Sequence, residues 1–198
     1  MMKKTLLISA IALLAGLSLN AQNSTAASMP KFAYVDFGVL VQLMPEMDEA
    51  RATMEASSNE AQETYKGMVE EYQKKLEQYQ QKAGTWTNAI RESKEKELGE
   101  LQTRITEFQE AIRQELQEQQ QKLMAPIQKK AVDAVNALAK EKGITAVFDS
   151  ASVLYIDPAQ CVDLMPEART ALNIPADRTI ESLQAELQAK AAAAANRQ

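Results

Sequence analysis

Few residues in this sequence could carry catalytic chemistry. Histidine is absent from all 198 residues, which removes the commonest general base, the usual partner of a nucleophilic Ser or Cys, and the commonest metal ligand. The acidic stretches at 95–100 (EKELGE) and 70–78 (EEYQKKLEQ) could suggest paired carboxylates. Their acids lie on predicted exposed helix beside lysines, where nothing would raise a carboxyl pKa. The sequence therefore predicts a protein that is not an enzyme, with no cofactor and no metal site.

Cysteine use and net charge limit the function further. The single cysteine, Cys161, cannot form a disulfide within one chain. We interpret it as a small buried apolar residue, the alternative being a reactive or intermolecular thiol. The formal net charge is −5, and removal of Lys3 and Lys4 with a signal peptide changes it to −7. An acidic exported chain is a poor binder of phosphate backbones, so no nucleic-acid partner is expected.

The first 21 residues have the features of a secretory signal peptide. Two lysines precede an apolar run from Leu6 to Leu19, and Ala21 marks the expected cleavage site. The apolar run is short for a membrane span. We expect residues 1–21 to be removed and residues 22–30 to form a flexible N-terminal segment.

Three short segments have the composition of β-strands: 32–37 (FAYVDF), 144–149 (ITAVFD) and 153–157 (VLYID). Only Ser-Ala-Ser separates the last two, which predicts a hairpin. Apolar side chains fall on both faces of the strands, so we expect both faces to be covered. Three strands leave sheet edges unpaired, and closure of several copies into a barrel would remove those edges.

The long segment between the first and second strands is rich in Glu, Gln, Lys and Ala, which favour helix. Apolar or small residues recur at helical spacing in two stripes, from Met47 to Ala83 and from Ile90 to Ile127. The stripes break at 83–87 (AGTWT), where Gly84 suits a helix C-terminus and Thr87 an N-cap.

Two arms of equal length follow from this break. Pro45 to Gly84 and Thr87 to Pro126 are each 39 residues, which predicts an antiparallel helical hairpin with arms about 58 Å long at ~1.5 Å per residue. Five acid–base pairs at i, i+4 favour exposed helix. They are Glu70/Lys74, Glu71/Lys75, Glu92/Lys96, Glu100/Arg104 and Glu118/Lys122. Pro126 interrupts the second stripe and predicts a hinge where the arm meets the body.

A short pattern occurs twice, as YVDFGVLVQLMPE at 34–46 and YIDPAQCVDLMPE at 155–167. In each, we expect a strand to end at an Asp, the chain to turn, and Pro45 or Pro166 to start a helix with Glu46 or Glu167 in its first turn. Two strand-to-helix exits of one body would explain the pattern without gene duplication.

The predicted fold is therefore α+β. A small β-barrel body, completed by association of several copies, comprises residues 31–44 and 127–173. The helical hairpin of 45–126, with its tip near 84–87, is inserted between the first strand and the other two. Residues 174–198 form a C-terminal extension that is partly helical or disordered. The sequence alone does not set the number of copies in the assembly.

The order of these landmarks resembles the Skp/OmpH family of periplasmic chaperones. The resemblance rests on KFAYVDFGVLVQLMPE, the Gln/Glu/Lys-rich hairpin, MAPIQKKAVDAVNALAKEKGITAVFDS and VLYIDPAQCVDLMPEARTALN, which together span about residues 30–173. It implies a periplasmic homotrimer, in which trimerisation completes the small β-barrel body and the helical hairpins project around a cavity. It further implies that unfolded outer-membrane proteins are held there without ATP.

The candidate functional residues comprise a client-binding set, a set in the trimer body and one hinge residue. Adaptable or amphipathic side chains suit client binding, although at helical spacing they also suit packing of the two arms. The client-binding candidates are Met47, Met54, Tyr65, Met68, Tyr72, Tyr79 and Trp86. The candidates for the trimer body are Phe32, Tyr34, Val35, Phe37, Val147, Phe148, Leu154 and Ile156. Pro126 is the candidate hinge.

The sequence leaves open one alternative to the chaperone hypothesis and two interpretations of the hairpin tip. An envelope scaffold or adaptor could use the hairpin to dock a folded partner, but this length leaves no room for the extra domains of periplasmic adaptors. Trp86 at the tip could touch clients or a membrane surface, or it could cap the hairpin.

Overall fold

The computed structural model describes residues 29–195, so the predicted signal peptide and most of the segment 22–30 lie outside the described residues. From Lys31 onward the described chain belongs to one compact unit. Its elements are β1 (Lys31–Val35), α1 (Phe37–Leu43), α2 (Pro45–Lys82), a 3-10 turn (Ala83–Thr85), α3 (Asn88–Glu141), β2 (Ile144–Asp149), a 3-10 turn (Ser150–Ser152), β3 (Cys161–Asp163), α4 (Met165–Ala171) and α5 (Ile180–Ala195).

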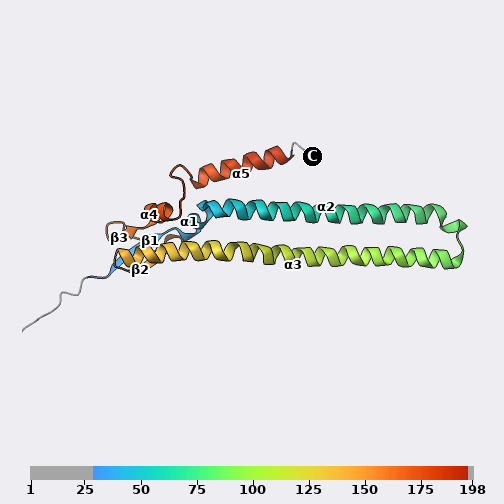
Figure 1. Ribbon diagram of the computed structural model, residues 1–198, viewed down its shortest axis with the longest axis horizontal. Helices are drawn as coiled ribbons and strands as arrows, with labels where there is room; N and C mark the ends of the chain where they lie inside the picture. Colours follow the sequence, from blue (N-terminus) through green and yellow to red (C-terminus); the bar gives the residue numbers. More distant parts are fainter. Residues whose placement is uncertain (1–28, 196–198) are drawn as a thin grey trace, which may run out of the picture. The chain divides into compact units, whose positions relative to one another are not determined.

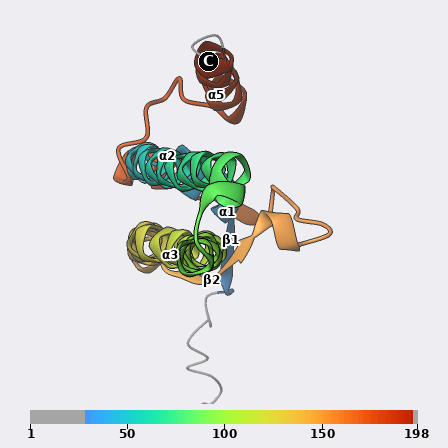
Figure 2. The ribbon, with the colours of Figure 1, turned by 90° about the vertical axis from the view of Figure 1, so that its right-hand side faces the viewer.

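The helices α2 and α3 lie side by side and antiparallel, as Figures 1 and 2 show. Pro45 stands in the first turn of α2, and Thr87 caps α3 by accepting a hydrogen bond from the N–H of Ile90. The predicted hairpin insertion between the first strand and the other two is therefore confirmed. Of the five predicted i, i+4 pairs, Glu71–Lys75 forms at 3.6 Å.

The arms differ in how they join the body. Helix α2 begins at Pro45, where the arm leaves the body. Helix α3 instead runs as one 54-residue helix through Pro126 into the body and ends at Glu141. The hinge at Pro126 stays a prediction. Beyond the proline, α3 buries Ile127, Ala131 and Val135 in the body.

Within residues 29–195 the sheet has three strands in the order β2-β1-β3, and both pairings are parallel. The predicted hairpin between the last two strands is therefore wrong. Residues 153–157 form no strand, and the third strand is Cys161–Asp163, on the opposite side of β1. Parallel strands need a crossover connection, and between β1 and β2 the whole helical hairpin supplies it.

Burial of Leu164 explains the position of β3. Leu164 is completely buried, and its N–H donates to the carbonyl of Tyr34 at 3.0 Å. This anchor fixes the preceding residues beside β1. Residues 153–160 must then connect β2 to β3, despite the strand-forming composition of their first part.

The first strand is shorter than expected because of a helix cap. Asp36 accepts a hydrogen bond from the N–H of Val39 at 2.9 Å, and α1 begins at Phe37. Asp149, at the end of β2, accepts from the N–H of Phe37 at 3.3 Å. Capping thus overrides the apolar alternation that predicted strand through residue 37.

The repeated pattern corresponds to similar structure only in its second half. Each proline starts a helix with an acid in the first turn, Glu46 in α2 and Glu167 in α4. The preceding residues Leu43, Met44 and Leu164 are fully buried. In the first halves, Tyr34 lies in β1 whereas Tyr155 lies in an exposed loop.

The core lies beneath one face of the sheet. Its fully buried large side chains are Leu40, Leu43, Met44, Leu164 and Leu172. They come from α1, α4 and the ends of these helices, and Ala33 and Val35 of β1 point toward them. None of the described helices is both long enough and apolar enough to cross a bilayer.

Two glycines give opposite expectations for substitution by alanine. Gly143 follows α3 with φ +63°, a left-handed conformation that costs an L-residue roughly 1 kcal/mol. Gly67 lies within α2, and a methyl group added at its Cα would meet no neighbouring atom within 4 Å. We expect Gly143→Ala to destabilise the protein by about 1 kcal/mol and Gly67→Ala to stabilise α2 by about 0.5–1 kcal/mol. Urea unfolding followed by far-UV circular dichroism checks both, and shifts of the same sign would contradict the prediction.

Candidate functional site

The tip of the hairpin is closed by an aromatic pair and a hydrogen bond between the arms. The rings of Tyr79 and Trp86 meet edge-to-face with centroids 6.0 Å apart. The Tyr79 hydroxyl donates to the carboxylate of Glu95 on α3, and this bond, aided by burial, raises the pKa of Tyr79. Half-buried Trp86 therefore contributes to packing at the tip, which favours the capping interpretation while leaving part of its ring accessible.

A three-residue ion cluster joins the arms about two turns from the tip. Glu97 of α3 accepts hydrogen bonds from Lys75 of α2 and from its neighbour Lys94. These two bonds lower the pKa of Glu97 to about 2. The carboxylate is therefore charged at any pH at which the protein would work.

This cluster predicts a specific pH dependence. A carboxyl group whose pKa is lowered by folding stabilises the folded protein at pH values above its ordinary pKa of 4.5. That stabilisation is lost as the pH falls from 4.5 toward 2. We expect NMR titration of the Glu97 carboxyl carbon to give a midpoint near 2, and Lys75→Met to raise it toward 4.5. Lys96→Met serves as the control, because Lys96 pairs with Glu100. A wild-type midpoint near 4.5 would contradict the cross-arm bond.

Two shallow grooves flank the middle of the hairpin, where small side chains of α2 face large apolar ones of α3. Ala61 lines both grooves, opposite Phe108 and Ile112. One groove encloses about 230 Å³, and the amide of Gln119 donates to the Ser57 hydroxyl across the arms at 3.0 Å beside it. Each groove offers apolar surface to a single inserted side chain.

All seven client-binding candidates are half-buried: Met47, Met54, Tyr65, Met68, Tyr72, Tyr79 and Trp86. Each side chain thus packs within the hairpin and also presents part of its surface to solvent. The structure brings Tyr79 and Trp86 together, and it distributes the other candidates along α2 as their helical spacing requires.

At its base, α2 is held by two ion-pair groups. The Nζ of Lys130 on α3 hydrogen-bonds Glu46, and this bond lowers the pKa of Glu46. In the second group, Asp48 binds Arg51 of the same helix at 2.9 Å and Arg178 of the C-terminal segment at 2.6 Å. Burial raises the pKa of Asp48, but the hydrogen bond and charge of Arg178 outweigh it, so the net shift is downward.

One face of the sheet is open. The rings of Phe32 and Phe148 lie 5.9 Å apart between centroids, and 36% and 44% of these residues are exposed. Tyr34 pairs in register with Phe148, so it lies on the same face. Parallel sheets are almost always covered on both faces. A single chain therefore leaves uncovered the face that the sequence predicted to be covered.

The loop after β2 exposes a second apolar surface next to the body. Leu154 is completely exposed and Tyr155 is 78% exposed, while Ile156 is half-buried. Figure 2 shows this loop, coloured orange, projecting from the body. Large apolar side chains exposed in this way mark an interaction surface.

Charge is unevenly distributed along the arms. The halves nearer the body, residues 45–65 and 105–126, contain ten acidic and three basic side chains. The distal halves, residues 66–82 and 88–104, contain seven acidic and eight basic side chains. The electrostatic potential is therefore negative near the body and close to neutral toward the tip.

A comparison with protein families matches residues 31–172 to the family described as "Outer membrane protein (OmpH-like)". The match includes the sheet, the hairpin and α4. The chain belongs to the Skp/OmpH family. Skp/OmpH proteins form a chaperone family associated with the periplasm and with outer-membrane proteins. A comparison with curated proteins found no match to this chain.

The trimer-body candidates of this Skp/OmpH chain fall in three environments. Val35 is buried in the chain's own core, whereas Phe32, Phe148 and Leu154 are exposed. The half-buried candidates are Tyr34, Phe37, Val147 and Ile156. Cys161 is half-buried in β3 and not fully buried as expected. The exposed members are the ones available to a second copy.

Two features of this Skp/OmpH chain could not be predicted from its sequence. Tyr155 was part of a predicted strand, and its position beside Leu154 on an exposed loop became evident only from the fold. The contact between Asp48 and Arg178 joins residues 130 positions apart. No local pattern signals such a pair, because each residue is ordinary for an exposed helix or loop.

Proposed function

We propose that this Skp/OmpH protein is an ATP-independent periplasmic holdase. It binds unfolded outer-membrane β-barrel proteins in a cavity between the arms of a homotrimer and prevents their aggregation. The proposal rests on family membership and on one structural observation above all, the apolar sheet face that a single chain leaves open.

Association through the body would cover this face. Phe32 and Phe148 would pack against equivalent side chains of neighbouring copies, which removes their apolar surface from water. Among the described residues the outer edges of β2 and β3 have no strand partner. Residues 153–157, which have strand composition, would pair with a neighbouring copy and close the sheets into a barrel.

The arms would then surround a common space. An unfolded client requires many weak contacts that can re-form as the chain moves, and half-buried Met and Tyr side chains provide them. The grooves beside Ala61 add apolar surface midway along each arm. The acidic halves near the body repel anionic surfaces, so capture would depend on apolar contacts.

Dilution of a urea-unfolded porin tests the proposal. We expect the purified mature protein to suppress light scattering and to form a soluble complex with the porin at about one trimer per client. An equal mass of serum albumin controls for nonspecific crowding. Unchanged scattering without a soluble complex would contradict the holdase function, and capture of one folded partner at fixed stoichiometry would support an adaptor instead.

A further inference from the structure

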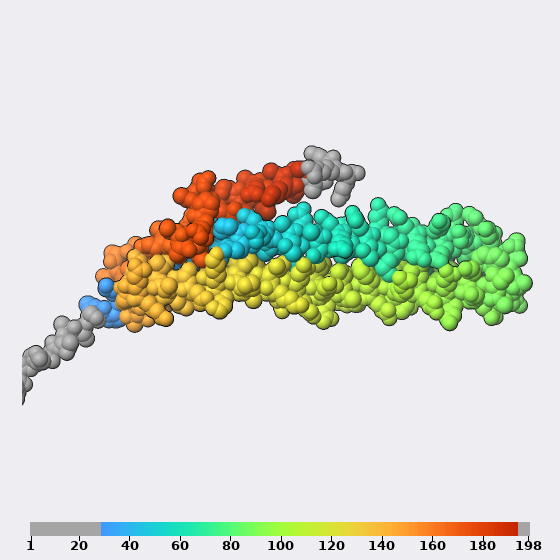
Figure 3. All heavy atoms as spheres, viewed as in Figure 1, coloured from blue at the N-terminus to red at the C-terminus, as the bar shows by residue number. Residues whose placement is uncertain are grey.

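The C-terminal segment 174–195 lies beyond the matched family region, yet it is attached to the body. Ile174 is 6% exposed and Leu183 of α5 is 4% exposed, and both belong to the same apolar core as Leu40. Figure 3 shows α5, coloured red, lying along the base of α2. Figures 1 and 2 agree that this is the side of α2 away from α3.

The chain before α5 is fixed by specific hydrogen bonds. Arg169 of α4 donates through Nη2 to the carbonyl oxygens of Pro175 at 2.7 Å and Arg178 at 2.6 Å. At the start of α5, Thr179 and Ser182 bond each other's backbone N–H groups at 2.9 and 3.1 Å. The segment therefore has a defined path and a capped helix.

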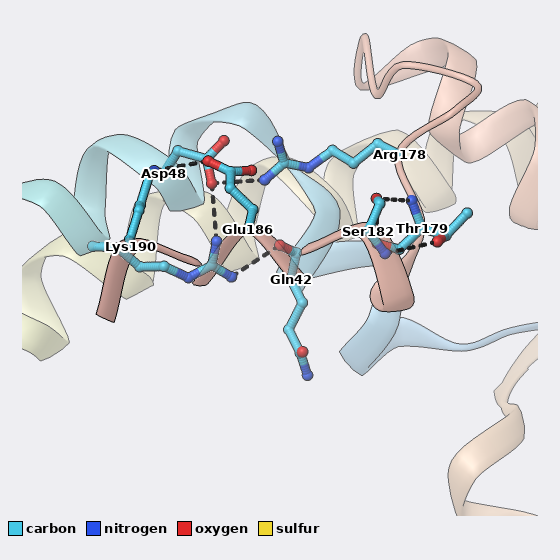
Figure 4. Close-up of polar contacts among 8 residues, drawn as sticks. Gln42, Asp48, Arg178, Thr179, Ser182, Glu186 and Lys190 are labelled. Atoms are coloured by element: carbon cyan, nitrogen blue, oxygen red, sulfur yellow. Dashed lines mark hydrogen bonds and ion pairs between the residues drawn. The ribbon is translucent and has the colours of Figure 1, made fainter. Parts of the chain in front are cut away.

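A charged network links the segment just before α5 to α2 and α1 (Figure 4). Arg178 Nη2 donates to Asp48 of α2 at 2.6 Å, and its side chain is only 17% exposed. Asp48 also accepts from Arg51, whose other Nη donates to the Gln42 carbonyl in α1 at 3.1 Å. Within α5 itself, Lys190 pairs with Glu186 at 2.7 Å. Asp48 thus joins α2 to the segment before α5, and Arg51 joins α2 to α1.

This network lies beside the connection between α1 and α2. Helices α1 and α2 are separated by the single residue Met44, whose backbone is extended (φ −63°, ψ 138°). A break of this kind allows the two helix axes to change their angle. Helix α3 has no equivalent break, since it is continuous to Glu141. Movement of α2 relative to the body would therefore occur at Met44, where the network lies.

We propose that residues 174–195 act as a strap that holds the first turns of α2 against α1 and limits the swing of this arm. The strap combines apolar attachment through Ile174 and Leu183 with the bond of Arg178 to Asp48 in the first turn of α2. In functional terms it rests on the proposed chaperone activity, because the arm that it restrains lines the client space.

Hydrogen exchange at residues 49–55 tests the strap in the mature protein. Arg178→Gln removes the charge that binds Asp48, and deletion of residues 174–198 removes the whole segment. Loss of a hydrogen bond to a charged group predicts exchange roughly three- to tenfold faster in Arg178→Gln, and faster still after deletion. Lys129→Gln is the matched control, since it removes one charge from an exposed pair with Asp133 on α3.

A double-mutant cycle separates the bond from a general loss of charge. Asp48→Asn and Arg178→Gln together should accelerate exchange less than the product of their separate effects, because both remove the same contact. Exchange at residues 49–55 that is unchanged in Arg178→Gln, or fully multiplicative effects in the cycle, would overturn the strap. This result is obtained even if the deletion variant fails to fold.

Client release distinguishes failure of the strap from failure of the proposed function. We expect porin to dissociate several-fold faster from Arg178→Gln than from wild type, with Lys129→Gln unchanged. If Arg178→Gln exchanges faster at residues 49–55 but releases porin at the wild-type rate, the strap does not control the client space. Absence of porin binding by the wild-type protein would instead count against the holdase function and leave the exchange result standing.

Discussion

The double variant Leu154→Asp/Tyr155→Asp is expected to be a folded single chain that no longer suppresses aggregation. Both side chains are exposed in the isolated chain, so their replacement leaves the core intact. In a closed assembly each would be buried, and a buried large apolar side chain contributes roughly 1.5–3 kcal/mol. Together their loss weakens association by at least roughly a hundredfold, and uncompensated burial of two carboxylates weakens it further. Light scattering gives the mass of the assembly.

The control for this variant is Ile90→Asp, which places a carboxylate at another exposed apolar position, in the first turn of α3. It should keep the mass of the wild type. Circular dichroism should show equal helix content in all three proteins. A double variant with the full mass of the assembly would exclude the loop 153–157 from the interface, and the open sheet face would then have to be covered in another way.

Leu164→Ala is expected to destabilise the body by about 2–5 kcal/mol. Leu164 is completely buried between β3 and α4, and its backbone N–H bonds the Tyr34 carbonyl. The substitution leaves a cavity where the third strand is anchored. Against a typical total stability of about 5–15 kcal/mol for a domain, this loss is large. Urea unfolding followed by far-UV circular dichroism measures it.

Val132→Ala provides the comparison for Leu164→Ala. Val132 is an exposed apolar residue on the body end of α3, and its truncation should change stability by no more than about 0.5 kcal/mol. Similar losses for the two variants would mean that Leu164 is not a core anchor. The wrong prediction of a strand at 153–157 would then lack the explanation offered by the fold.

The helical hairpin could be predicted because its signals are local. Spacing of apolar residues along α2 and α3 defines the stripes, and Thr87 caps the second helix through a bond to the residue three positions later. The packing role of half-buried Met and Tyr side chains follows from the same spacing. Local interactions were thus sufficient to predict both helices of the hairpin and the turn between them.

The body could be predicted only in part, because its arrangement depends on distant contacts. Strand composition identified residues 144–149 correctly, but β3 is set by burial of Leu164 and by its bond to Tyr34. The segment 153–157 has strand composition without a strand partner in its own chain. Likewise, the Arg178–Asp48 contact depends on the path of the C-terminal segment around the body.

Because α3 is continuous from the tip to the body, a tilt of this helix at the body is carried to its far end. From Asn88 to Pro126 the helix spans about 58 Å at ~1.5 Å per residue, so a tilt of about 5° at the root moves the far end by roughly 5 Å. Small changes of side-chain packing around Ala131 and Val135 would therefore be amplified at the opening between the arms, far from where they originate.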